Sequence, residues 1–96
     1  MKPSEALRSH REEIRRVVEL NRARNPRVFG SVLHGADIDG SDLDLIVDPL
    51  PGATLFDMGG LQSGLEELLG VPVDVLTPAD LPAKYRERVL REALPV

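Results

Sequence analysis

Apolar residues recur along the chain with two different periods, and these periods predict its secondary structure. Three segments carry apolar side chains at helical spacing, three or four residues apart: 4–22, 54–69 and 83–94. Three short apolar runs predict strands: 27–30, 43–47 and 71–76. The connector over 32–41, with one helical turn at 32–36, joins the first two strands.

Residues that start and stop helices support these boundaries. Thr54 and Asp57 have capping-box spacing at the start of the second helix, and Gly70 is placed to end it. Asn25-Pro26 follows the first helical segment and is predicted to end it. Pro72 stands at the beginning of the third strand, which favours an edge or strand-entry position.

The order of the predicted elements is helix, strand, short helix, strand, helix, strand, helix. This order predicts an α/β (α+β) fold in which a small mixed sheet of three to four strands is backed by helices. Because no long helix joins the first two strands, we expect them to be antiparallel. The 96 residues predict a single domain spanning 1–96, with a core of Leu, Val and Ile because only three residues are aromatic.

The composition of the chain argues against some classes of binding partner. The chain has no cysteine, which fits a reducing cytoplasm, and no apolar run near the roughly 20 residues that span a bilayer. A net charge of −4 and few aromatic residues argue against direct binding of nucleic acid. Basic residues gather at the two ends of the chain, as solvated helix faces or, alternatively, as a surface for a partner.

Two carboxylates at the start of the second strand are the first candidates for chemistry. Asp42 and Asp44 are two residues apart, so in a strand their side chains project to the same face. Like charges so close repel each other unless a cation lies between them, and oxygen ligands suit Mg²⁺. The alternative is a polar strand end that serves a turn. Asp44 lies inside an apolar run with no Lys or Arg nearby, which favours the metal.

Two further features complete the candidate site. Asp74 lies between Val73 and Val75, so alternation places its side chain on the face opposite to theirs. A third carboxylate of this kind suits a metal or general-base site. The Gly30-Ser31 turn ends the first strand, and its backbone N–H groups can hold a phosphate. Together these residues indicate metal-assisted phosphoryl or nucleotidyl transfer.

This pattern resembles the minimal nucleotidyltransferase family of the polymerase-beta-like superfamily. That family carries Gly-Ser, ten intervening residues, Asp-x-Asp, and a later Asp on another strand. The resemblance implies a polymerase-beta-like core in which Asp42, Asp44 and Asp74 are catalytic and bind Mg²⁺. It also implies that Gly30 and Ser31 hold the β- and γ-phosphates of ATP, and that Asp74 accepts the proton of the attacking hydroxyl.

The resemblance further implies a biological role. Stand-alone family members of this size look like antitoxins of HEPN-domain ribonuclease toxins, and some transfer AMP to a toxin tyrosine, which implies a hetero-oligomer. The alternative is a non-catalytic binding module that neutralises the toxin by contact alone. His34 stands where relatives usually have Arg, and this departure favours the alternative. A third reading is a nucleotidyltransferase for a small molecule, with its pocket completed by another subunit.

A calcium-binding loop is a competing interpretation of residues 37–48, which are rich in Asp. Such a loop needs Gly at its sixth position, where this chain has Asp42, and its seventh to eleventh positions read here as a strand. The pattern therefore argues against calcium.

Overall fold

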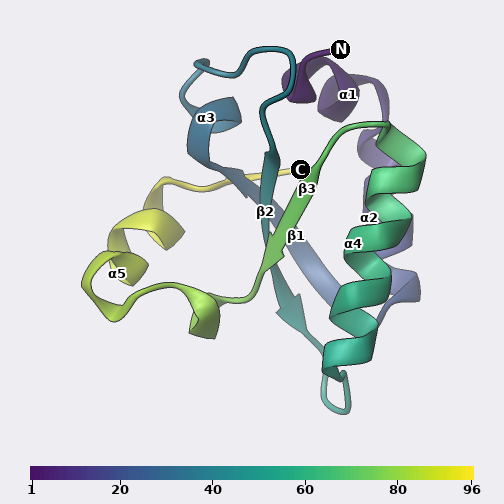
Figure 1. Cartoon of the computed structure of the whole chain (residues 1–96). Coiled ribbons are helices and arrows are strands. Elements are labelled where there is room, and N and C mark those ends of the chain that lie inside the picture. Colours follow the sequence, from purple (N-terminus) through teal and green to yellow (C-terminus); the bar gives the residue numbers. More distant parts are fainter.

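A four-stranded mixed sheet forms the centre of the molecule (Figure 1). In the computed structural model, which describes all 96 residues, the strands lie in the order β3-β2-β1-β4. Their bounds are Ala23–Phe29 (β1), Leu43–Pro49 (β2), Val73–Leu76 (β3) and Leu94–Pro95 (β4). β1 runs antiparallel to β2 and β4, and β2 runs parallel to β3. The predicted fold class and the antiparallel pairing of the first two strands are confirmed.

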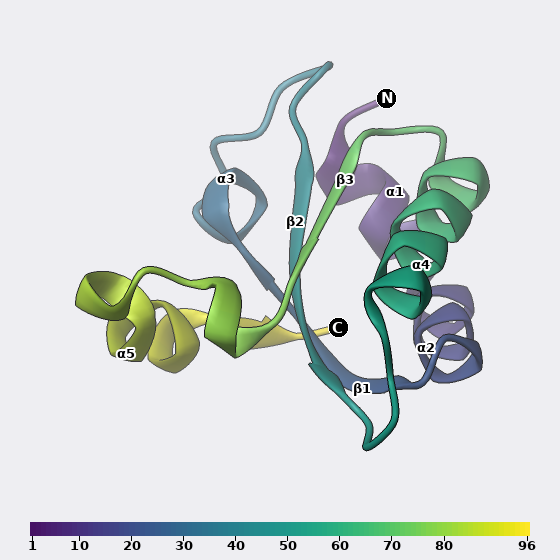
Figure 2. The same cartoon turned by 60° about the horizontal axis from the view of Figure 1, so that its bottom comes forward.

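Helices lie on both sides of this sheet. Figure 2 shows α2 and α4 on one side, and α3 and α5 on the other. The helices are Pro3–Ser9 (α1), Arg11–Leu20 (α2), Gly30–Leu33 (α3), Leu55–Leu69 (α4) and Ala83–Glu92 (α5), with a 3₁₀ turn at Pro78–Asp80 (η1). None of them combines the length and the apolar character that crossing a membrane requires.

The alternation of β2 separates the two sides of the sheet. Leu43, Leu45 and Val47 are fully buried and belong to the main core cluster, together with residues of α2 and α4. Asp44 and Asp48 point to the opposite face, because successive side chains of a strand alternate, and both are half-buried. A single strand therefore contributes both the core and the polar face that α3 and α5 flank.

α4 begins and ends where the sequence predicts. The hydroxyl of Thr54 accepts a hydrogen bond from the backbone N–H of Asp57, and the Asp57 carboxylate accepts one from the backbone N–H of Thr54. This capping box satisfies N–H groups that have no partner within the helix. Gly70 ends α4 in the left-handed conformation, with φ of 68°.

The N-terminal segment departs from the single helix predicted over 4–22. His10 has φ of −132° and ψ of 28°, outside the helical region, and separates α1 from α2. Arg22, with a positive φ of 58°, then turns the chain away from α2. β1 consequently begins at Ala23, earlier than predicted.

Asn25 and Pro26 lie inside β1, so the prediction that they end the first helix is wrong. Asn25 adopts a positive φ of 57°, and the pairing of β1 with β2 shifts its register between Arg24 and Arg27. The amide of Asn25 donates a hydrogen bond of 3.0 Å to the carboxylate of Asp48 on β2. Asn25 and Pro26 are residue types that favour turns, and here they form a bulge within a strand instead of ending a helix.

The C-terminal residues form a strand that the helical pattern did not predict. α5 ends before residue 94, because Leu94 pairs with Val28 of β1 as part of β4. The backbone N–H of Val96 donates to the carbonyl of Pro26 (2.9 Å), and the Nε of Arg15 donates to the carbonyl of Val96 (2.9 Å). These distant contacts override the local helical preference.

β3 is an edge strand, as Pro72 predicts, but it is shorter than the predicted run from 71 to 76. The backbone N–H of Val73 donates to the carboxylate of Glu66, and that of Val75 donates to the amide oxygen of Gln62. Because side chains of α4 occupy these N–H groups, this edge is protected from pairing with another strand.

Candidate functional site

The structure places Asp44 and Asp74 side by side. They are register partners in the parallel pair of β2 and β3. Register partners in a sheet project to the same face, and here it is the face away from α2 and α4. Asp44 is half-buried and Asp74 is exposed, so the pair lies where one carboxylate is shielded from water and its neighbour is accessible.

Asp42 lies just before β2, two residues from Asp44, and is exposed. The pKa of Asp44 is raised to about 6, first by burial and then by the negative charges of Asp74 and Asp42. The charges of Asp42 and Asp74 thus both act on Asp44. No Lys or Arg pairs with any of them, because the two ion pairs of the molecule are Met1–Asp39 and Arg27–Asp48. A bound cation would offset this repulsion.

Gly30 allows the Gly30-Ser31 turn to approach the carboxylate of Asp44 closely. It has φ of 74°, and a β-carbon built on it would collide with the Oδ2 atom of Asp44. Only glycine permits both this conformation and this close approach. Ser31 follows in the first turn of α3 and is half-buried. The predicted turn and Asp44 are therefore direct neighbours.

The three aspartates do not form a ready-made metal cage. No three His, Cys, Asp or Glu side chains of the structure are gathered closely enough to hold a metal ion as they stand. Charged carboxylates with nothing between them repel each other, so an open arrangement agrees with their chemistry. Three carboxylates fit the oxygen preference of Mg²⁺, but their joint binding of one ion stays a prediction.

Arg27 lies on the same face of the sheet as Asp44, but it forms an ion pair with Asp48. Its Nη1 atom is 3.1 Å from Oδ1 of Asp48. Burial acts to raise the pKa of Asp48, but hydrogen bonds from Asn25 and Arg27 together with the charges of Arg27 and Arg24 outweigh it, so the pKa is lowered. Arg27 is thus part of a pair that holds β1 to β2.

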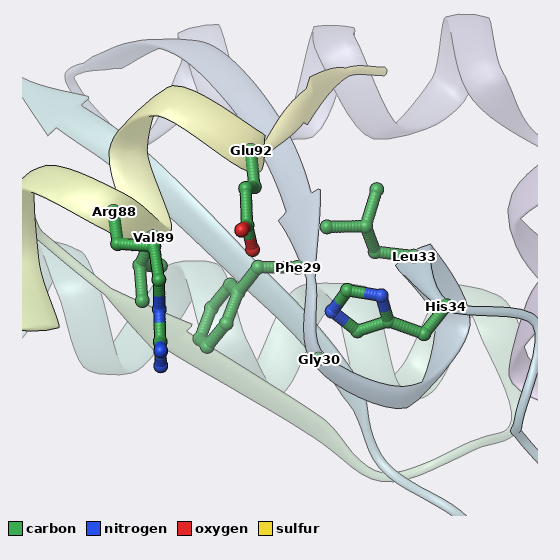
Figure 3. Close-up of a pocket in the computed structure, with 7 residues that line it drawn as sticks. All are labelled: Phe29, Gly30, Leu33, His34, Arg88, Val89 and Glu92. Carbon is green, nitrogen blue, oxygen red and sulfur yellow. The ribbon is translucent and has the colours of Figure 1, made fainter.

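A pocket of about 160 Å³ adjoins Gly30, between α3 and α5 (Figure 3). His34 lines it from the end of α3, whereas Arg88 and Glu92 line it from α5. The helical pattern of residues 83–94 predicts that Arg88 belongs to a solvated or docking helix face. Its proximity to Gly30 depends on how α5 folds back over the sheet, for which the local pattern carries no signal.

The connector between α3 and β2 is tied to α1 by a carboxylate that the sequence interpretation did not single out. Asp37 is 8% exposed and accepts a hydrogen bond of 2.9 Å from the backbone N–H of Ser4. This hydrogen bond lowers the pKa of Asp37. Asp39 pairs with the N-terminal amine at 2.9 Å. Two carboxylates of the competing calcium pattern therefore have other partners.

Adjacent carboxylates beside a glycine turn, on the open face of a small mixed sheet, define a site suited to phosphoryl chemistry. The model of the nucleotidyltransferase domain family matches residues 7–96 of the chain. The chain belongs to this family and is a nucleotidyltransferase enzyme.

Individual relatives agree with this assignment. The chain is 34% identical to the protein adenylyltransferase MntA of Thermococcus cleftensis, over 92% of this chain and 86% of the relative. It is 38% identical to a protein of Methanocaldococcus jannaschii that is also named for protein adenylyltransferase activity, over 72% of this chain and 74% of the relative.

Solved structures show the same fold. A protein described as a minimal nucleotidyltransferase superposes with a TM-score of 0.86 and 44% identity, over 97% of this chain and 95% of the other. A toxin-antitoxin structure with AMP-PNP superposes with a TM-score of 0.69 over 83% of this chain and 66% of the other. At 18% identity the second likeness concerns the fold alone.

Proposed function

We propose that this nucleotidyltransferase transfers AMP from ATP, with Mg²⁺, to a tyrosine hydroxyl of a HEPN ribonuclease toxin, and that it is the antitoxin of that toxin. The observation that carries the proposal is the pairing of Asp44 with Asp74 on adjacent strands, together with the close approach of Gly30 to Asp44. The names of the curated relatives support AMP transfer to a protein. We further propose that residues 1–96 act as a single domain.

Each site residue has a role in this proposal. Asp42, Asp44 and Asp74 hold the divalent ion, which would neutralise negative charge on the nucleotide phosphates. Gly30 and Ser31 bind the phosphates through the turn next to Asp44. Asp74 is the exposed carboxylate of the pair, so it is the one that an acceptor hydroxyl can reach.

In the proposed transfer, one bond forms at the α-phosphorus of ATP and one bond breaks there. The acceptor hydroxyl gives its proton to Asp74, and its oxygen forms a bond to the α-phosphorus of ATP. The bond between the α-phosphorus and the oxygen that bridges to the β-phosphate breaks, and pyrophosphate leaves with that bonding pair. The acceptor retains AMP as a phosphodiester.

The acceptor is proposed to be a protein because this chain offers little room for one of its own. The two pockets of the structure measure about 160 and 240 Å³, below the usual range for a site that encloses a small organic substrate. A partner that presents its own tyrosine needs no such enclosure. The toxin-antitoxin neighbour with AMP-PNP shares this fold and is compatible with the proposal.

Labelled ATP tests the proposal directly. The chain, the toxin encoded beside it, Mg²⁺ and ATP labelled at the α-phosphate are incubated, and label on the toxin is measured. We expect label with the parent chain and with the control Asp48→Asn, which removes a carboxylate from the same strand and face. We expect none with Asp42→Ala/Asp44→Ala. Equal labelling by the double variant would refute the proposed site.

A non-catalytic antitoxin is the second candidate, and His34 favours it, since an imidazole offers phosphate fewer N–H donors than the guanidinium of an arginine. The same double variant separates the two functions. If it still inhibits the ribonuclease activity of the toxin as well as the parent chain does, contact alone accounts for neutralisation.

A further inference from the structure

The solvent side of α4 carries an exposed aromatic ring next to positions with little or no side chain. Phe56 is 91% exposed in the first turn of the helix. Gly59, Ser63 and Glu67 follow at steps of three or four residues, so they share one face with Phe56, and all three are exposed. We call these four residues the outer face of α4. It is turned away from the sheet, because the buried leucines of α4 occupy the other side of the helix.

The glycines of α4 are not all explained by packing within the chain. The helix contains three of them, and each costs about 1 kcal/mol relative to alanine. A β-carbon on Gly60 would lie 3.1 Å from Oδ1 of Asn21, and one on Gly64 would lie 3.4 Å from Cγ1 of Val17. These two glycines therefore admit α2, which runs antiparallel beside α4 (Figure 1). A β-carbon on Gly59 would meet nothing within 4 Å, so no contact in the chain requires a glycine there.

The outer face of α4 is complementary to itself. A two-fold axis can pair α4 with a second α4 in the antiparallel direction, so that each step forward along one helix is a step back along the other. When Phe56 lies opposite Ser63 of the second copy, Gly59 lies opposite Gly60 of that copy. The backbones can then approach closely at the glycines, and each Phe56 ring enters the space beside them. Leu20, which is 77% exposed at the end of α2, extends this apolar surface.

The charges at the ends of this pairing are complementary as well. The same register sets Glu67 opposite residue 52 of the second copy. The Nη1 atom of Arg22 lies 3.9 Å from the place that a β-carbon on Gly52 would take. Arg22 and Glu67 are both exposed, and neither takes part in an ion pair within the chain. Two-fold symmetry therefore sets a carboxylate against a guanidinium twice, once at each end of the interface.

We propose that the outer face of α4 binds a second copy of this chain, with the two α4 helices antiparallel. This inference stands independently of the proposed function. Because α4 covers the face of the sheet opposite to Asp44 and Asp74 (Figure 2), both candidate sites stay open in the dimer. One helix face is at the small end of specific interfaces, and we therefore expect a dissociation constant of about 20 µM.

Sedimentation velocity of the full chain, from about 1 to 500 µM, measures the dimer. Gly59→Ala should have two effects of opposite sign. It should raise the unfolding temperature of the dilute monomer, because alanine favours the helix, and weaken dimerisation about tenfold, because its methyl group separates the backbones. Phe56→Ser should weaken dimerisation about thirtyfold. Leu55→Ser is the matched control, since Leu55 is 90% exposed but points about 100° away around the helix, and dimerisation should be unchanged.

The two charges supply a test that needs two different molecules. Arg22→Glu and Glu67→Arg should each weaken dimerisation about fivefold, because each homodimer then contains two like-charge pairs. An equimolar mixture of the two variants should dimerise as tightly as the parent chain, because both pairs of the mixed dimer are again of opposite charge. A contact inside one chain cannot produce this rescue.

Several results would overturn this assignment. A parent chain that stays monomeric at about 500 µM has no such interface. A dimer that tolerates Phe56→Ser, or a mixture that shows no rescue, forms through another surface. If the parent chain is monomeric and Phe56→Ser instead weakens its binding to the toxin encoded beside it, the toxin occupies this face.

Discussion

The two faces of the sheet carry different kinds of side chain. The face under α2 and α4 is apolar, whereas the face beside α3 and α5 carries carboxylates. Leu43, Leu45 and Val47 need only exclusion from water, which the helices provide. Asp44 and Asp74, on the other face, carry like charges side by side without a basic partner. The apolar face is complete within this chain, whereas on the polar face the bound cation of the proposed function would offset the repulsion.

The polar face also has a small apolar region of its own. Ile46 is fully buried although it points to the same side as Asp44, and Leu81, just after η1, is 4% exposed. Neither belongs to the main core cluster. β2 contacts η1, the turn just before Leu81, and this contact helps to hold the segment that leads into α5.

The largest effect that we expect from the polar face is loss of activity with stability retained. Asp74→Asn removes the proposed proton acceptor, and AMP transfer should fall by about a thousandfold. Because Asp74 is exposed, the unfolding temperature should stay close to that of the parent chain. Label transfer and thermal unfolding are measured on the same preparation. A variant that transfers AMP at the parent rate shows that Asp74 does not serve the reaction.

The apolar face should give the opposite result. Leu45 is fully buried in the main core, and Leu45→Ala should lower the free energy of unfolding by about 2–5 kcal/mol, because it leaves a cavity. The rate of AMP transfer per folded molecule should be retained. Urea unfolding and active-site titration check both statements. A loss of activity in fully folded protein would mean that the two faces are coupled.

The sequence predicts those features that depend on neighbouring residues. The alternation of β2 places Asp44 opposite Leu43 and Leu45, and the capping box and Gly70 delimit α4, because these signals act within a few residues. β4 was missed because it exists only through pairing with β1 and through the contact of Arg15 with Val96. The place of Arg88 beside Gly30 was missed for the same reason.

Gly30 offers a finer test of how closely the two parts of the site meet. Gly30→Ala should cost about 1–2 kcal/mol through its positive φ. It should also push Asp44 aside and lower AMP transfer about a hundredfold, as misplacement of reacting groups does. Gly35→Ala is the matched control, since Gly35 has φ of 68° but open space around it. It should show the stability loss without the loss of activity. Equal activity of the two variants would rule out the close approach of Gly30 to Asp44 as a requirement.

The smallest expected effect concerns the connector that leads from the Gly-Ser turn to Asp42. The hydrogen bond from the N–H of Ser4 lowers the pKa of Asp37 in the folded protein. The folded state therefore favours the ionised form, and this stabilisation is present above the unfolded pKa of about 3.9. It is lost as the pH falls through the lower, folded pKa. Asp37→Asn should thus unfold at a lower temperature than the parent chain at pH 7, and the difference should vanish near pH 2.

The variant Glu87→Gln, which removes an exposed carboxylate from α5, serves as its control and should show no such dependence on pH. A difference between Asp37→Asn and the parent chain that is the same at pH 7 and pH 2 would mean that the charge of Asp37 does not hold the connector. No difference at either pH would mean that the acceptor oxygen alone, which asparagine retains, accounts for the contact with α1.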